Sequence, residues 1–359
     1  MFKKLFIVFT IFIFIFYAGS VYAKVFLYTN SNGETYLVRD NNYKPNNKNA
    51  ITIKYNNIIR FKGTISTYLS SFSEGLADIK INGKHGFINK NGKLIIPFLF
   101  GGSAWDFREG LCPIENNSRK WGFINKKGKW VIPPEFKFAS SFNEGLAKVE
   151  DNNGESGYIN KMGQWVIPPE FDISGGFHDG LANVNTNNNI KRGFINKNGI
   201  MVIPQEFVHT WGFQDGLAAV KIKNKDGWGF INEKGILVLL PKYHNIWGLS
   251  FNEGLVPIEI NNKYGFINKK GILIIPAKFR RANDFHEGIA SVEFNNKKWG
   301  LINKKGKVIL ILSYKIKFVL SFYDGLARFE SINGEYAYMN KKGKEVIPVK
   351  INKPFKIQY

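Results

Sequence analysis

Residues 121–134 read WGFINKKGKWVIPP, and residues 142–149 read FNEGLAKV. The second phrase returns along the chain as eight copies of Phe-x-[Glu/Asp]-Gly-[Leu/Ile], spaced 34 to 38 residues apart. The glycines of the eight copies are Gly75, Gly110, Gly145, Gly180, Gly216, Gly254, Gly288 and Gly325. A period in this range is typical of solenoids, propellers and arrays, in which one small unit is stacked on its neighbours.

The first phrase supplies a hairpin to every copy. An asparagine stands at its turn in all eight copies, followed three residues later by a glycine, as at Asn125 and Gly128. Asparagine at the first position and glycine at the fourth is the chemistry of a type I turn, in which the side chain bonds the local backbone and glycine takes a positive φ. The eighth copy is degenerate before its asparagine and reads Tyr336-Ala337-Tyr338-Met339-Asn340.

One unit therefore contains strands at 146–150, 157–160 and 165–168, followed by a connection of about ten residues that has room for a short fourth strand. Seven of the eight copies carry a proline in the third of these strands, and the seventh copy has Ile311 instead. Because proline cannot donate to a ladder, this strand is predicted to be the edge of its sheet. The strands are apolar enough that both of their faces are expected to be buried.

The predicted fold is all-β, a tandem repeat of about eight small antiparallel sheets of three to four strands. Burial on both faces requires the sheets to stack face to face. Two arrangements achieve this, a β-propeller-like ring and an open β-superhelix.

Three regions are predicted along the chain. Residues 1–23 read as a signal peptide, with two lysines, an apolar run and a small residue at the predicted cleavage site after Ala23. An uncleaved membrane anchor is the alternative. Residues 24–65 are a divergent cap or a degenerate repeat, and residues 66–359 form the repeat domain. We therefore expect an exported protein, located in the periplasm, at the cell surface or outside the cell, and without a membrane span once the leader is removed.

These motifs resemble the bacterial WG-repeat family, named for a Trp-Gly pair that is seen here at residues 121–122, 228–229 and 299–300. The resemblance spans residues 72–348. The chain departs from the pattern where His85, Ser156, Arg192 and Tyr264 replace the tryptophan, and where Ala337 replaces the glycine. The resemblance implies a repeat module without family catalytic residues, often found in exported or surface proteins.

The acid before each turn glycine is the most regular polar feature of the chain. These acids are Glu74, Glu109, Glu144, Asp179, Asp215, Glu253, Glu287 and Asp324. They could bind a cation or form the paired carboxylates of a hydrolase. Eight equal copies instead favour a carboxylate that caps the backbone amides of its own tight turn, since an active site needs groups that differ in their surroundings.

No other motif for catalysis is recognisable. The five histidines do not have metal-ligand spacing, although His178 and His286 occupy the same variable slot of the repeat. The single cysteine, Cys112, is expected to be a buried apolar residue. We therefore predict a protein that is not an enzyme and has no cofactor or metal, with a propeller-type glycan hydrolase as the alternative.

Three tryptophans break the repeat pattern and are the predicted binding residues. Trp105, Trp211 and Trp247 lie in the connections before the turns, where other copies carry small residues such as Ala139 and Ala282. Loops on a rigid scaffold often carry binding function, so these rings could stack on sugars or on peptide side chains. They could equally cover the ends of the stacked sheets.

The chain has a formal net charge of +22, from 50 Lys and Arg against 28 Asp and Glu. Such a balance favours anionic partners, although lysines dispersed over turns also serve solubility. Export and the lack of a recognition motif argue against nucleic acid. The predicted function is an exported binding scaffold for a protein or an anionic glycan at the cell envelope, and a structural envelope protein is a further alternative.

Overall fold

The Asn-x-x-Gly turns form in all eight copies as the sequence predicts. In the second copy, Asn125 Oδ1 accepts hydrogen bonds from the backbone N–H groups of Lys127 at 3.0 Å and Lys129 at 3.1 Å. The Gly128 N–H donates to the Asn125 carbonyl at 2.9 Å, and Gly128 has a φ of 74°. The same pair of side-chain bonds recurs in the other seven copies.

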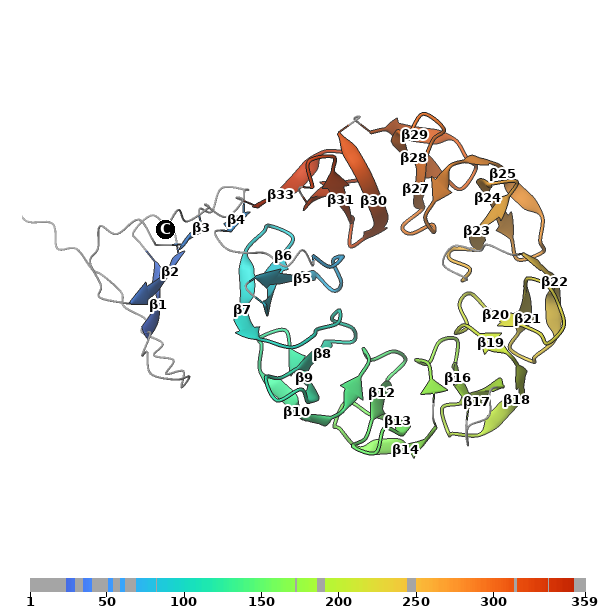
Figure 1. Ribbon diagram of the computed structural model, residues 1–359, viewed down its shortest axis with the longest axis horizontal. Coiled ribbons are helices and arrows are strands. Elements are labelled where there is room, and N and C mark those ends of the chain that lie inside the picture. The colour runs from blue at the N-terminus through green and yellow to red at the C-terminus, as the bar shows by residue number, and fades with distance from the viewer. Residues whose placement is uncertain are drawn as a thin grey trace, which may run out of the picture.

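A computed structural model describes residues 69–351 apart from 82, 172, 186–190, 244–249, 313–314 and 335, together with the strand segments 24–29, 35–40, 51–53 and 59–61. All regular elements in these residues are β-strands. Eight small antiparallel sheets follow one another around a closed ring (Figure 1). This confirms the predicted tandem repeat and selects the propeller-like ring over the open superhelix. The predicted leader, residues 1–23, lies outside the described residues.

Each sheet forms one blade, and its strands follow one another in sequence order from the centre of the ring outward (Figure 1). The second strands are β5 (Leu76–Ile81), β8 (Leu111–Glu115), β12 (Ala147–Glu150), β16 (Leu181–Asn185), β20 (Leu217–Lys221), β23 (Leu255–Ile260), β27 (Ile289–Glu293) and β31 (Leu326–Ser331). The third strands are β6 (Lys84–Asn89), β9 (Trp121–Asn125), β13 (Ser156–Ile159), β17 (Arg192–Asn196), β21 (Trp228–Asn232), β24 (Lys263–Asn268), β28 (Trp299–Asn303) and β32 (Tyr336–Asn340).

The first and fourth strands are the inner and outer layers. The first strands are β11 (Phe138–Ala139), β15 (Ile173–Ser174), β19 (His209–Thr210), β26 (Arg281–Ala282) and β30 (Ile316–Tyr323), so the predicted short extra strand exists. In the first two blades, single bridges at Leu69 and Ala104 take its place. The fourth strands are β7 (Leu94–Phe100), β10 (Trp130–Phe136), β14 (Trp165–Phe171), β18 (Met201–Phe207), β22 (Leu237–Tyr243), β25 (Leu273–Phe279), β29 (Val308–Ile311) and β33 (Glu345–Ile351).

Four more strands precede the ring. β1 (Lys24–Thr29), β2 (Thr35–Asp40) and β3 (Ile51–Ile53) form an antiparallel sheet of their own. β4 (Ile59–Phe61) pairs in parallel with β33 of the eighth blade. The fourth strand is therefore the sheet edge in blades 1 to 6, as its proline predicts, and also in blade 7, which has no proline, but not in blade 8. The predicted boundary at residue 65 stays a prediction.

The core lies between neighbouring blades. A buried aromatic ring from the third strand of one blade packs on the phenylalanine of the next Phe-x-[Glu/Asp]-Gly turn, as Phe123 does on Phe142 with ring centroids 4.8 Å apart. The same contact recurs between Phe87 and Phe107, Tyr158 and Phe177, Phe194 and Phe213, Phe230 and Phe251, and Phe266 and Phe285. Each of these rings is fully buried. The aromatic residues that recur along the repeats therefore form the contacts that stack the blades.

The glycine of the Trp-Gly pair is required by the outer strand. In blades 1 to 6 the outer strand bulges as it passes this residue, and a Cβ on Gly122 would stand 2.6 Å from the carbonyl oxygen of Ile132. In the eighth blade Ala337 pairs in plain register with Pro348. The alanine is tolerated there because the bulge at that point is absent.

The outer strands are not buried on both faces, so that prediction was wrong. In β10, Trp130 is 38% exposed and Val131 is 45% exposed, whereas Ile132 is only 2% exposed. In blades 1 to 7 the fourth strand lies at the rim of the ring, so it has a neighbouring strand on its inner side only. The apolar run of this strand covers the inner layers and leaves part of its own surface in water.

Candidate functional site

The tight turn between the first and second strands forms the inner rim of each blade. Its two central residues both have positive φ, 53° at Glu144 and 86° at Gly145, which defines a type I′ turn. Glycine adopts this conformation freely, but glutamate does so rarely. A side chain interaction is therefore needed to hold the acid in place.

That interaction joins each blade to the next. The Glu144 carboxylate accepts a hydrogen bond of 3.0 Å from the backbone N–H of Gly180, the turn glycine of the following copy. The equivalent donor and acceptor pairs are Gly110 and Glu74, Gly145 and Glu109, Gly216 and Asp179, Gly254 and Asp215, Gly288 and Glu253, Gly325 and Glu287, and Gly75 and Asp324. The carboxylates thus have a structural partner. The sequence suggested that each would bond to its own turn, but the partner is the turn of the next copy.

Lysines from the outer hairpins complete this arrangement. Lys126 Nζ lies 2.9 Å from a Glu74 carboxylate oxygen, and Lys161 lies 2.9 Å from Glu109. Equivalent ion pairs join Lys197 to Glu144, Lys304 to Glu253, Lys341 to Glu287 and, at 3.8 Å, Lys90 to Asp324. Burial alone would raise the pKa of Glu109, but hydrogen bonds from Lys161 and Gly145 and the charge of Lys161 lower it overall. The inner turns and the outer hairpins therefore lie on the same face of the ring.

The variable residue of each inner turn differs from blade to blade. At this position the chain carries Ser73, Arg108, Asn143, His178, Gln214, Asn252, His286 and Tyr323. His178 Nδ1 lies 3.0 Å from Asn143 Nδ2, and the Tyr323 hydroxyl lies 3.0 Å from His286 Nε2. The turns that carry this position lie toward the centre of the ring (Figure 1).

Arg108 acts electrostatically on residues of distant blades. Burial first, and then the Arg108 charge, lowers the pKa of both His178 and His286, which belong to blades 4 and 7. Burial also raises the pKa of Asp284 from 3.8 to about 7. Its Oδ1 atom is buried without a hydrogen-bond partner among the described residues. The inner turns thus bring together titratable side chains of different kinds, Arg108, His178 and His286. In the sequence these residues appear only as a variable position of the repeat.

Two of the three predicted tryptophans, Trp105 and Trp211, lie among the described residues. Trp105 and Trp211 occupy the same position in blades 2 and 5, with exposed fractions of 47% and 50%. Their backbone N–H groups donate to the carbonyls of Pro113 and Ala219 in the second strands. The Trp105 ring packs edge-on against Phe138 of the next blade at 6.4 Å. Trp247 lies outside the described residues, and ligand binding by these rings stays a prediction.

Two single residues of the sequence analysis have structural partners. Cys112 is fully buried, as predicted, and its Sγ lies 3.0 Å from the Trp105 carbonyl oxygen. His85, which replaces a tryptophan of the repeat, is buried and lies 2.7 Å from the Asp78 carboxylate and 2.9 Å from the Gly102 carbonyl oxygen. Within the described residues, no three His, Cys, Asp or Glu side chains are grouped to hold a metal ion.

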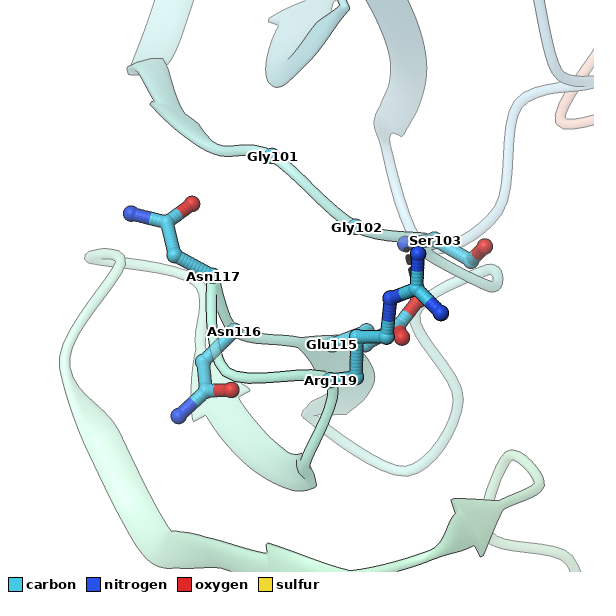
Figure 2. Close-up of a pocket in the computed structure, with 7 residues that line it drawn as sticks. All are labelled: Gly101, Gly102, Ser103, Glu115, Asn116, Asn117 and Arg119. Carbon is cyan, nitrogen blue, oxygen red and sulfur yellow. Dashed lines mark hydrogen bonds between the residues drawn. The ribbon is translucent and has the colours of Figure 1, made fainter.

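A polar hollow lies on the opposite face, beside the hairpin between β8 and β9 (Figure 2). It is lined by Gly101, Gly102, Ser103, Glu115, Asn116, Asn117 and Arg119. Glu115, Arg119 and Ser103 gather at one end of it, and the two asparagines point away. The Ser103 N–H donates to the Glu115 carboxylate at 2.9 Å, so this hollow is explained by a connection that packs on its own hairpin.

The face that carries the outer hairpins has a strongly basic half. We call this face the hairpin face; its hairpins are residues 89–93, 125–129, 160–164, 196–200, 232–236, 268–272, 303–307 and 340–344. Ten exposed lysines of this face make no ion pair with another described residue: Lys234, Lys269 and Lys270 lie in blades 5 and 6, and the other seven lie in blades 7, 8, 1 and 2. These seven, the basic arc, are Lys93, Lys127, Lys129, Lys305, Lys307, Lys342 and Lys344, and all are exposed.

The basic arc comes from blades 7, 8, 1 and 2, which are the last and the first in sequence. They become neighbours only because the ring closes between blades 8 and 1. The positive charges of lysines on adjacent blades add up, so the arc concentrates positive potential on one half of this face. The sequence showed the lysines as dispersed, since it could not place the two ends of the repeat array side by side.

Eight radial sheets with hydrogen-bonded inner turns define a β-propeller. The family described as WG containing repeat matches residues 66–84, 86–119, 121–154, 157–189, 193–225, 228–264, 264–297 and 299–336. The chain belongs to this family. A search of curated proteins finds no match.

Solved structures similar to this chain are found at low sequence identity. A eukaryotic initiation factor is 11% identical with a TM-score of 0.49, and covers 74% of this chain and 82% of its own. BamB from Moraxella catarrhalis is 10% identical with a TM-score of 0.43, covering 77% and 92%. The WD40 β-propeller domain of Doa1 is 13% identical with a TM-score of 0.33, covering 59% and 81%. With TM-scores below 0.5, these likenesses add no argument about what this chain binds.

Proposed function

We propose that this protein is an exported, non-catalytic scaffold that binds an anionic partner, a glycan or an acidic protein, at the cell envelope. The basic arc is the observation that carries the proposal. It places seven exposed lysines on four adjacent blades of one face. A surface of one charge sign on a rigid frame attracts and orients a partner of the opposite sign.

The regular acids support a non-catalytic role. Each ring carboxylate accepts a hydrogen bond from the next blade, and six of them also pair with a lysine. A hydrolase needs one acid and one base that differ in environment. Equal structural bonds around the ring leave these carboxylates without that difference, which favours a framework over an active site.

Heparin, a sulfated glycan, is a suitable probe for the basic arc. Replacing Lys93, Lys129, Lys307 and Lys344 by glutamine should weaken heparin binding by at least about tenfold, because four surface charge contacts are lost. Glutamine suits this position, since Gln164 occupies it in blade 3. The measurement is a binding isotherm at low salt.

The matched control removes the same charge from the opposite face. Lys137, Lys223, Lys225 and Lys297 are exposed on connections and hairpins of that face. Their replacement by glutamine should leave heparin binding within about twofold of the unaltered chain. Equal losses in the two variants, or no heparin binding at all by the unaltered chain, would contradict the proposal.

A further inference from the structure

The other half of the hairpin face carries exposed apolar side chains beside the three lysines Lys234, Lys269 and Lys270. Met162, Ile200, Ile236 and Ile272 belong to the hairpins of blades 3, 4, 5 and 6, and we call them the apolar arc. Their exposed fractions are 75%, 58%, 58% and 55%. A single exposed apolar residue is ordinary, but here such residues recur on four successive hairpins of one face.

The contrast between the arcs is set at one repeat position. The residue after the turn glycine is Lys93, Lys129, Lys307 and Lys344 in blades 1, 2, 7 and 8, and Ile200, Ile236 and Ile272 in blades 4, 5 and 6. The backbone is the same in both groups. Each of these residues donates its N–H to the side chain of the turn asparagine, as Lys129 does at 3.1 Å and Ile200 does at 3.1 Å. The fold therefore accepts either residue, and packing does not require the isoleucines.

We infer that the hairpin face docks onto an anionic lipid surface, with the basic arc at the headgroups and the apolar arc in the interface. This inference rests on the proposed function, since it uses the same basic arc, and it adds an anionic lipid surface to the glycan and the acidic protein proposed above as partners of this face. Binding of a peripheral protein grows with the apolar area that enters the interface and with attraction to anionic lipids. One face of this ring offers both.

The layout of the apolar arc favours lipid over the other anionic partners. A protein interface has a contiguous apolar centre with a polar rim, whereas these four side chains are dispersed, one to a blade. A glycan is bound by aromatic platforms and convergent hydrogen-bond groups, which aliphatic tips do not supply. A bilayer takes up dispersed apolar side chains one by one. Its plane also suits a face made of eight equivalent hairpins.

Replacing isoleucine by lysine separates lipid insertion from simple charge attraction. The variant carries Ile200→Lys, Ile236→Lys and Ile272→Lys, which gives blades 4 to 6 the residue that blades 1, 2, 7 and 8 already have. The probes are vesicles of phosphatidylcholine alone and vesicles that also contain phosphatidylglycerol, with co-sedimentation of residues 24–359 as the measurement. The unaltered chain should bind only the anionic vesicles.

The variant should bind anionic vesicles at least about tenfold more weakly than the unaltered chain, despite its greater positive charge. Its binding to heparin should be unchanged or stronger. Stronger vesicle binding by the variant would overturn the inference, because charge alone would then account for docking. Heparin binding without vesicle binding by the unaltered chain would overturn this inference and leave the proposed function standing, and the loss of both would overturn the two together.

Discussion

The Asp324 carboxylate accepts a hydrogen bond of 2.6 Å from the backbone N–H of Gly75, 249 residues earlier in the chain. It is the same bond that joins every other pair of neighbouring blades, here made between the last blade and the first. Tyr338 packs on Phe72 at 4.7 Å across the same junction. The ring is closed by ordinary repeat contacts, and in addition β4, which precedes the first blade, pairs with β33 of the last blade.

Removing the closing carboxylate should destabilise the protein. We expect Asp324→Ala to lower the free energy of unfolding by about 1–3 kcal/mol, the usual range for a hydrogen bond to a charged group. Chemical denaturation measures the change. Glu233→Ala is the matched control, because Glu233 is an exposed acid on the same face without such a bond. An equal loss in both variants would contradict the assigned role of Asp324.

Exchanging glycine and alanine should affect stability more at Gly122, the glycine of a Trp-Gly pair, than at Ala337, its counterpart in the eighth copy. Gly122→Ala should cost about 2–4 kcal/mol, because its Cβ would meet the Ile132 carbonyl oxygen at 2.6 Å and the bulged strand must move. Ala337→Gly should cost only about 1 kcal/mol, chiefly from backbone entropy. Equal costs in denaturant titrations would show that the bulge does not set the residue at this position.

The ring acids should make stability depend on pH in the acid range. Hydrogen bonds and the paired lysine hold the pKa of Glu109 and of Glu253 below the ordinary value of 4.5, despite the opposing effect of burial. A lowered folded pKa contributes stability that is complete above the unfolded pKa and is lost as the pH falls through the folded pKa. The double variant Glu109→Gln, Glu253→Gln should therefore be less stable than the unaltered chain at pH 7. The difference should shrink toward pH 3, and a constant difference would contradict this reasoning.

Asp284 should have the opposite pH dependence. Burial raises its pKa to about 7 from 3.8, so the folded state resists ionisation that the unfolded state accepts, and stability falls as the pH rises from 4 to 7. Asp284→Asn should match the unaltered chain near pH 4 and exceed its stability above pH 7 by at most about 4 kcal/mol. Glu233→Gln, at an exposed acid, should show no such divergence. A variant that is less stable at pH 8 would show that the Asp284 charge is used in the fold.

The local structure of this protein could be predicted from its sequence, because it depends on residues close together in the chain. Asn125 and Gly128 are enough to define a hairpin, and the proline of the outer strand correctly marked an edge in blades 1 to 6. The partner of Glu144 could not be predicted in this way. Its hydrogen bond goes to Gly180 of the next copy, and only the stacking of blades brings that N–H within reach.

The candidate surfaces depended even more on closure. The lysines of blades 1 and 8 are far apart in sequence, so the basic arc had no sequence signal beyond the net charge of +22. The apolar run of each outer strand led to the wrong prediction that both of its faces are buried. Here a buried strand and a strand at the rim have the same composition, so the sequence does not distinguish them. The alternation of lysine and isoleucine after the turn glycine, as at Lys129 and Ile200, was the signal that could have revealed the two arcs.

Small-angle scattering of residues 24–359 in solution tests the closed ring most directly, because the basic arc exists only if blades 8 and 1 meet. The account predicts a compact particle with a radius of gyration of about 20 Å, as expected for a folded chain of this length. An elongated particle, with a markedly larger radius and a long tail in its distance distribution, would show an open superhelix and contradict the account.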